Sequence, residues 1–261
     1  MQASIIIPSL GRGESLKKCL DSVNQQTYRN FEVVLVTEEG ELAPLRNKGA
    51  KKAKGEILIF IDDDVILTEG WLQAIIETFS SRADVGGVSG PAVITDNYRI
   101  NRDIFKYKKV KKLYDLLFLD GMEDFPGHIT RSGAWTTGAC NPDCNYDGDV
   151  DFLEACNMSF RRRAFEQVGG FDESFRGVGD WSEPDLAFRI WEKGWGLWFN
   201  SLARLEHQPS KSGAFGKRAK DAPNRLKNYL LFADRHVPPH WSHSLYKLFL
   251  RGYYATQSLK R

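Results

Sequence analysis

Ile57-Leu58-Ile59-Phe60-Ile61-Asp62-Asp63-Asp64 is the stretch that decides the fold, because five apolar residues lead directly into three carboxylates. Continuous apolar runs are typical of strands that are buried on both faces of a parallel sheet. Ligands of open α/β sheets bind just beyond the carboxyl ends of such strands. The stretch therefore predicts a buried strand that delivers an acidic cluster to a ligand site.

The three carboxylates repel one another unless a cation neutralises them. Hard oxygen ligands favour Mg²⁺ or Mn²⁺, with substrate phosphates completing the coordination shell. Taken alone, the triplet also suits a solvated acidic turn at the end of a strand. The rest of the sequence has to decide between these two interpretations.

Composition indicates a soluble globular protein. The chain has 261 residues, 42% of them hydrophobic and 27% charged, which is enough for a substantial core. No run approaches the roughly 18 apolar residues of a membrane-spanning helix, and the N-terminus lacks a signal-peptide pattern, so we expect a cytosolic location. The net charge of +2 hides a basic C-terminal region, since residues 211–261 carry eleven Lys/Arg and two Asp. No nucleic-acid-binding motif accompanies this charge, so we expect no nucleic-acid partner.

The four cysteines, Cys19, Cys140, Cys144 and Cys156, do not suggest a disulfide framework in a chain of this size. Cys140 and Cys144 could hold zinc with Cys156 as a third ligand. No fourth His or Cys lies close in sequence, so reduced thiols are the favoured interpretation.

Strand and helix signals alternate along the first ninety residues. Leu16, Leu20 and Val23 recur at helical spacing, as do apolar residues between 72 and 79. We expect strands at 4–8, 31–36, 56–61 and 85–90, and helices at 14–26, 44–54 and 70–82. This alternation predicts an α/β fold with a Rossmann-like, mostly parallel central sheet flanked by helices.

The second half is less regular. Residues 97–150 lack a clear period, apart from a helix expected near 104–119, and long irregular stretches of this kind are usually functional or mobile. Further expected elements are strands at 155–160, 197–199 and 204–206, helices at 163–168 and 183–193, and two tail helices at 224–234 and 242–257.

Four stretches, in order, resemble the family-2 glycosyltransferases. They are Ser4-Ile5-Ile6-Ile7-Pro8-Ser9-Leu10-Gly11-Arg12, Leu45-Arg46-Asn47-Lys48-Gly49-Ala50 with the acidic triplet, the segment 160–173, and the segment from Glu183 to His207. The resemblance covers about residues 3–208. It implies a GT-A type fold and an inverting transfer of sugar from a nucleotide-diphospho-sugar, a UDP-sugar first of all, to a glycan or lipid-linked hydroxyl. It also implies Mn²⁺ or Mg²⁺ as cofactor.

The resemblance carries donor-side roles onto several residues. Asp64 and Asp62 would hold the metal, with His207 as a further ligand. The residues implied to contact the nucleotide-sugar are Pro8, Ser9, Arg12, Glu38, Arg46, Asp62 and Asp63. Trp181 is a further candidate from its place before the acidic helix, because aromatic faces stack on sugar rings, although a buried core role is the usual one for tryptophan. Glu38 stands in Val36-Thr37-Glu38-Glu39-Gly40, where the family usually has an Asp-Asp-Gly-Ser-like turn. Arg46 could pair with this acid or with diphosphate.

Inversion by direct displacement needs a base to deprotonate the acceptor hydroxyl. The family usually has Glu-Asp-x-Asp-Leu here, whereas this chain reads Ser182-Glu183-Pro184-Asp185-Leu186. We expect Glu183 to be the base, with Asp180 and Asp185 as the other candidates. The same acids also suit favourable charges at a helix N-terminus.

The resemblance suggests a division of the chain into residues 1–95 as a nucleotide-sugar-binding half, 96–210 as the acceptor-binding half of the same domain, and 211–261 as a basic helical tail. Residues 241–258 suit a helix on anionic headgroups at the inner face of a membrane, and equally a helix packed onto the catalytic domain. A nucleotidyltransferase of similar fold, a non-catalytic nucleotide-sugar-binding module and a partner subunit remain alternatives, the non-catalytic ones because Ser182 replaces an acid.

Overall fold

The computed structural model describes residues 1–11, 13–94, 108–209 and 220–259. Arg12, part of the expected irregular stretch and part of the basic tail lie outside these ranges. Every expected strand and helix has a counterpart within a few residues of its predicted bounds. The expected helix near 104–119 is described as α4 (Lys108–Phe118).

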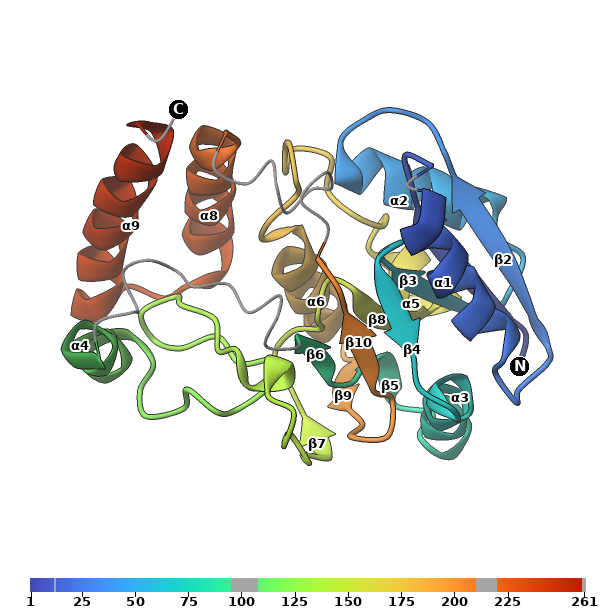
Figure 1. Cartoon of the computed structure of the whole chain (residues 1–261). Coiled ribbons are helices and arrows are strands. Elements are labelled where there is room, and N and C mark those ends of the chain that lie inside the picture. The colour runs from blue at the N-terminus through green and yellow to red at the C-terminus, as the bar shows by residue number, and fades with distance from the viewer. Residues whose placement is uncertain (12, 95–107, 210–219, 260–261) are drawn as a thin grey trace.

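A seven-stranded sheet forms the centre of the molecule, as Figure 1 shows. In sheet order the strands are β2 (Phe31–Val36), β1 (Ala3–Pro8), β3 (Ile57–Ile61), β8 (Asn157–Arg161), β5 (Val85–Ser89), β9 (Gly196–Phe199) and β7 (Gly148–Asp149). β1 pairs in parallel with β2 on one side and β3 on the other, and β5 pairs in parallel with β9. β8 lies antiparallel between β3 and β5, and β7 lies antiparallel to β9 at the edge.

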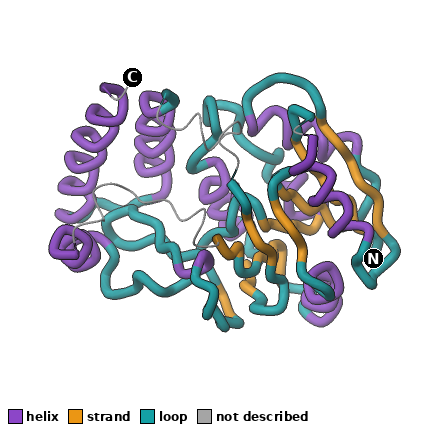
Figure 2. Tube along the Cα trace, viewed as in Figure 1, coloured by secondary structure: helices purple, strands orange, loops and turns teal. Residues whose placement is uncertain are grey.

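Helices cover both faces of this sheet, which explains the continuous apolar strands (Figure 2). Alternate side chains, such as Ile59 and Ile61, pack against α1 (Gly13–Asn24) and α3 (Trp71–Ser81). The intervening side chains, such as Phe60, pack against the opposite layer of α2 (Leu42–Lys52), α5 (Arg162–Gln167) and α6 (Ser182–Glu192). Each fully buried Ile, Leu or Phe stabilises the fold by about 1.5–3 kcal/mol.

Helix α2 lies unusually close to β1. A Cβ atom on Gly49 would stand 2.3 Å from Cγ2 of Ile6, so only glycine allows this approach. The close packing brings Arg46, one turn earlier on the same helix, into the interior of the protein, where it is 1% exposed.

A smaller three-stranded sheet crosses the end of the central one. It consists of β4 (Val65–Leu67), β10 (Leu205–His207) and β6 (Ala92–Ile94), with β10 in the middle. Strands of two or three residues show at most a weak period, and the sequence predicted β10 but missed β4, β6 and β7.

The remaining helices form an aromatic cluster beside the sheet. α8 (Ala222–His236) and α9 (Trp241–Leu259) lie side by side, with α4 across one end of the pair (Figure 1). Tyr229, Phe232 and Tyr246 are among the buried residues of this cluster. A short 3₁₀ turn, Gly138–Cys140, lies in the segment between α4 and β7.

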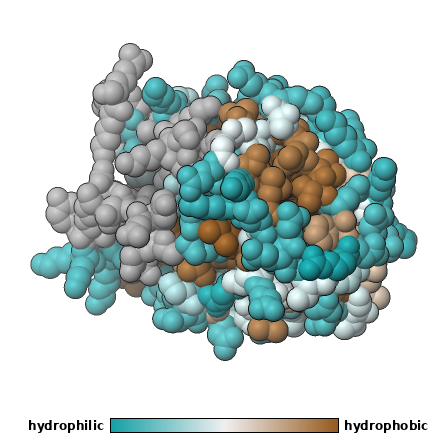
Figure 3. All heavy atoms as spheres, turned by 45° about the vertical axis from the view of Figure 1, so that its right-hand side comes forward, coloured by the Kyte–Doolittle hydropathy of each residue, from teal (hydrophilic) through white to brown (hydrophobic). Residues whose placement is uncertain are grey.

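The face shown in Figure 3 has one main area of hydrophobic side chains, bordered by hydrophilic ones. Among the described residues, no helix is both long and apolar enough to cross a membrane.

Candidate active site

A cavity of about 720 Å³ opens at the carboxyl edge of the central sheet. Chain segments that follow β1, β2 and β3, the end of β10 and the start of α6 all reach it. Of the predicted site residues, those that line it are Pro8, Ser9, Glu38, Arg46, Asp62, Asp64, Asp180, Glu183 and His207. The strand-end location expected from the acidic triplet is therefore confirmed.

The triplet points in two directions. Asp62 and Asp64 line the cavity, whereas Asp63 is fully buried and accepts a hydrogen bond of 2.6 Å from the Ser9 hydroxyl. Ser15 donates to the backbone carbonyl of Asp63 as well. The expected contact of Asp63 with the nucleotide-sugar does not fit this placement. The Asp63 carboxylate binds the loop after β1 and does not line the cavity.

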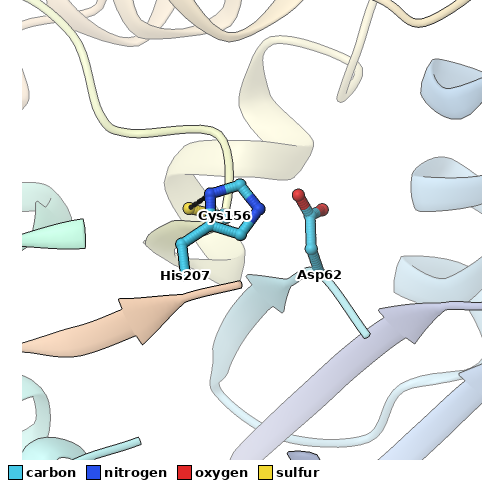
Figure 4. A group of neighbouring side chains, drawn as sticks. All are labelled: Asp62, Cys156 and His207. Carbon is cyan, nitrogen blue, oxygen red and sulfur yellow. Dashed lines mark hydrogen bonds between the residues drawn. The ribbon is translucent and has the colours of Figure 1, made fainter. Parts of the chain in front are cut away.

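His207, Cys156 and Asp62 all line the cavity and lie next to one another (Figure 4). Their candidate ligand atoms all lie within 4.8 Å of one another. Nε2 of His207 is 3.3 Å from Asp64 Oδ1, while its Nδ1 is 3.7 Å from Cys156 Sγ. The two carboxylates and the imidazole are a donor set that suits a divalent cation, so the predicted metal ligands are brought together.

The cysteines do not form the alternative zinc site considered from the sequence. Cys144 is buried in the core on the α2 side of the sheet, and Cys156 lies beside His207. Cys140 is half-buried and lines the cavity. The thiol nearest to the expected metal ligands is therefore Cys156.

Arg46 connects the two acidic parts of the site. Its guanidinium donates to Glu183 Oε1 at 2.5 Å and to the carbonyl of Ala155 at 3.0 Å. It also lies 3.8 Å from the carboxylate of Asp62. Of the two partners considered for Arg46, diphosphate and Glu38, the second is engaged elsewhere, since Glu38 pairs with Lys48 and Lys52.

Glu183 occupies the first turn of α6 and is 6% exposed. Burial raises the pKa of its carboxyl, and the attraction of Arg46 only partly offsets this effect. A carboxylate with a raised pKa is a stronger base, so this environment suits proton abstraction.

The other two base candidates are engaged elsewhere. Asp180 lines the cavity, but its carboxylate pairs with Arg225 at 2.5 Å. Asp185 is fully buried outside the cavity lining, where it accepts from Arg189 at 2.7 Å and lies 3.0 Å from His236. Asp185 is therefore not placed to meet an acceptor, because its side chain points toward α8.

Glu154 is a cavity carboxylate that the sequence reasoning missed. Burial raises its pKa to about 7, the negative charge of Glu183 adds to the increase, and His207 opposes it. The residue lies in an irregular segment before β8, where no motif singled it out. Only its neighbours in space reveal it, because the charges that shift its pKa belong to Glu183 on α6 and His207 on β10.

Trp181 corrects another expectation. Its indole is 2% exposed and stacks between Trp135, with ring centroids 4.3 Å apart, and Phe232, at 5.1 Å. No face of this ring is open to a sugar, because α8 covers it. The tryptophan that lines the cavity is Trp135.

The backbone of Trp181 adopts φ +78°, a conformation that is unfavourable for a bulky residue. Its buried ring and strained backbone fix the start of α6, and thereby the position of Glu183 two residues later.

Comparison with known proteins agrees with this geometry. The family model described as glycosyl transferase family 2 matches residues 4–41 and 37–135, together a little over half of the chain. The glucosyl-dolichyl phosphate glucuronosyltransferase of Haloferax volcanii is 24% identical over 247 residues, which cover 80% of this chain and 69% of that protein.

Two solved structures share the fold. The mannosyltransferase PcManGT from Pyrobaculum calidifontis, in complex with GDP-Man and Mn²⁺, has a TM-score of 0.58 at 18% identity, covering 97% of this chain and 69% of its own. GalNAc-T7 with UDP, GalNAc and Mn²⁺ has a TM-score of 0.62 at 14% identity, covering 100% of this chain and 56% of its own. The family model, the GT-A type architecture and the facing acidic groups lead to one conclusion: the chain belongs to glycosyl transferase family 2.

Proposed function

We propose that this protein is an inverting glycosyltransferase that moves a sugar from a nucleotide-diphosphate donor to a hydroxyl acceptor. The observation that carries the proposal is the arrangement around Arg46, which pairs with Glu183 and lies beside Asp62 in the same cavity. One side of the cavity thus offers ligands for a cation and the other offers a buried carboxylate base.

Asp64, Asp62 and His207 would hold Mn²⁺ or Mg²⁺ on the donor side. When bound, such an ion supplies positive charge that neutralises the diphosphate leaving group. Pro8, Ser9 and Glu38 line the same cavity, and we propose that Glu38 contacts the nucleotide base.

Glu183 would accept the proton of the acceptor hydroxyl as the hydroxyl oxygen attacks the anomeric carbon. The attack comes from the face opposite the leaving diphosphate, so the anomeric configuration inverts. Arg46 orients the Glu183 carboxylate through their 2.5 Å hydrogen bond. Trp135 lines the cavity and offers an aromatic surface for a sugar ring.

A UDP-sugar remains our proposed donor and a lipid-linked glycan our proposed acceptor. The archaeal relative is named for a dolichyl-phosphate-linked substrate, which supports the acceptor class. UDP is bound by one structural neighbour and GDP-mannose by the other, so a test of the donor needs both nucleotides.

A lipid-linked acceptor fits a surface formed by α4 and α9. Hydrophobic side chains are exposed on both helices, beside the basic residues Lys108, Lys109, Lys111 and Lys112. We propose that this surface contacts anionic lipid headgroups through residues 241–258 and through α4. The exposed hydrophobic residues are Val110, Leu113, Leu116, Trp241, Leu245 and Leu248.

Thermal unfolding with UDP-sugars and GDP-sugars, each with and without Mn²⁺, tests the donor side. We expect one donor to raise the melting temperature in an Mn²⁺-dependent way, and Asp64→Asn to abolish the increase. Asp143→Asn, an exposed carboxylate outside the cavity lining, is the matched control. The proposal fails if no donor binds and Asp64→Asn behaves like the parent protein.

A nucleotide-sugar-binding module without catalysis is the second candidate. It is favoured by the buried Ser182 at the position of an expected acid, and by the ion pairs that engage Asp180 and Asp185. A protein that binds the donor tightly, but neither hydrolyses nor transfers it, would support this module. Transfer to an acceptor, with an inverted product identified by NMR, would exclude it.

A further inference from the structure

Strand register brings a thiol to the metal-binding side of the cavity. β8 pairs antiparallel with β3, and Asn157 lies opposite Ile61. One residue further along the same register, Cys156 lies opposite Asp62. In the smaller sheet, His207 pairs with Val65, which places its ring above the same strand end. The backbone of three distant segments therefore fixes this cluster.

The two ring nitrogens of His207 face different side chains, Asp64 and Cys156. Nδ1 is 3.7 Å from Cys156 Sγ (Figure 4). Nε2 is 3.3 Å from Asp64 Oδ1. Two ligand sets consequently share His207 and Asp62. One is completed by the hard carboxylate of Asp64, and the other by the soft sulfur of Cys156.

We propose that Cys156 is a metal ligand that makes this cluster a binding site for thiophilic divalent ions such as Zn²⁺ and Co²⁺. Thiolate and imidazole ligands favour zinc, whereas carboxylates suit Mn²⁺ and Mg²⁺. Cys156 is 6% exposed, so few water molecules compete for the position. As the sulfur–metal bond forms, the thiol proton passes to solvent.

The shared ligands make the two kinds of ion mutually exclusive. A zinc ion held by Cys156, His207 and Asp62 removes two of the three residues proposed to hold Mn²⁺. Zinc would therefore compete with Mn²⁺ and prevent Mn²⁺-dependent donor binding. The preference for one ion over the other is a property of the protein's own side chains, so it can be measured without nucleotide-sugar or acceptor.

Absorption spectroscopy with Co²⁺ tests the sulfur ligand directly. We expect the parent protein to show a sulfur-to-metal charge-transfer band in the near ultraviolet, and Zn²⁺ to displace it stoichiometrically. Cys156→Ala should lose the band and bind Zn²⁺ more weakly in titration calorimetry by at least the roughly 10- to 100-fold that loss of an outer-shell partner typically costs, while its Mn²⁺ affinity is unchanged. Cys156→Ser, with a hard hydroxyl oxygen, should also lose the band.

Two other cysteines provide matched controls. Cys144→Ala removes a buried thiol outside the cluster and should keep both the band and the Zn²⁺ affinity. Cys140→Ala removes the other cavity-lining thiol and should do the same. Metal-free thermal unfolding establishes that each variant is folded.

Several results would overturn the proposal. One is a parent protein that binds Co²⁺ without the band, a measurement that needs no variant. Another is equal Zn²⁺ affinity in the parent and in Cys156→Ala. A third is loss of the band in Cys140→Ala and not in Cys156→Ala. Failure of the glycosyltransferase proposal leaves each of these measurements unaffected.

Discussion

Glu183 is a carboxylate whose basicity is set by burial and by one cation. Burial raises its pKa, while Arg46 at 2.5 Å keeps its ionised form in place. Glu183 lines the cavity, and its cationic partner Arg46 also lies beside the proposed metal ligand Asp62. Neither Asp180 nor Asp185 has both of these features.

Glu183→Gln is expected to lower kcat by about 10²- to 10⁴-fold, because a general base contributes a factor of this size. Donor binding should be preserved, since the amide keeps the shape and one hydrogen-bond acceptor for Arg46. Initial rates against donor concentration measure both quantities. Glu173→Gln removes an exposed carboxylate near α2 and should leave the rates unchanged. A kcat for Glu183→Gln within about tenfold of the parent would contradict the role of base.

Glu154 is expected to produce a rise in rate as pH increases through about 7, the value to which burial and the charge of Glu183 raise its pKa. Below this pH the Glu154 carboxyl is neutral; above it, a second negative charge next to Glu183 increases the basicity of Glu183. A pH–rate profile of the parent should therefore show an inflection near 7 that Glu154→Gln lacks. An unchanged inflection in the variant would assign the titration to another group.

At the scale of elements, buried charges tie α6 to α8. Asp185, at the start of α6, pairs with Arg189 on its own helix and with Arg235 and His236 at the end of α8. Burial opposes ionisation of Asp185, but the hydrogen bond with His236 and the pairing with Arg189 outweigh it and lower its pKa. The start of α6, which carries Glu183, is therefore held by α8.

Asp185→Asn should destabilise the fold by about 1–3 kcal/mol, because the fully buried carboxylate is the shared hydrogen-bond partner of Arg189, Arg235 and His236. Urea denaturation of the parent and the variant measures the difference. Since the folded-state pKa is depressed, the contribution of Asp185 is fully present above its unfolded value near 3.9 and is lost as pH falls through the folded value. Asp234→Asn, an exposed partner of Lys247, is the control and should change stability by less than about 1 kcal/mol. Equal effects of the two substitutions would argue against a structural role for Asp185.

Sequence reasoning predicted the elements with strong periods and missed features that depend on packing between distant segments. The apolar runs of β1, β3 and α3 carry their own signal, because each is buried along most of its length. The burial of Trp181 depends on α8 covering it. The position of Glu154 depends on β8 entering the sheet between two earlier strands. Neither arrangement leaves a local pattern in the sequence.

At the scale of the whole molecule, the outer side of α9 presents Trp241 and Leu248, which are 64% and 65% exposed. Combined replacement of Trp241 and Leu248 by Glu should reduce flotation with anionic vesicles several-fold, because both apolar area and charge attraction decrease. Leu202→Glu changes an equally exposed leucine (73%) in the turn between β9 and β10 and should leave flotation unchanged. Equal flotation of all these proteins, or none by the parent, would exclude this lipid-binding surface.

The position of β8 between β3 and β5 has a consequence for how the protein is made. A growing chain that has emerged only as far as residue 150 contains β3 and β5 but not the strand that joins them. Both would keep open edges with unpaired backbone groups, and such edges favour pairing with other chains. The ribosome therefore delivers these strands in an order that differs from their order in the sheet, and β3 and β5 can be joined only after residue 161 has been synthesised.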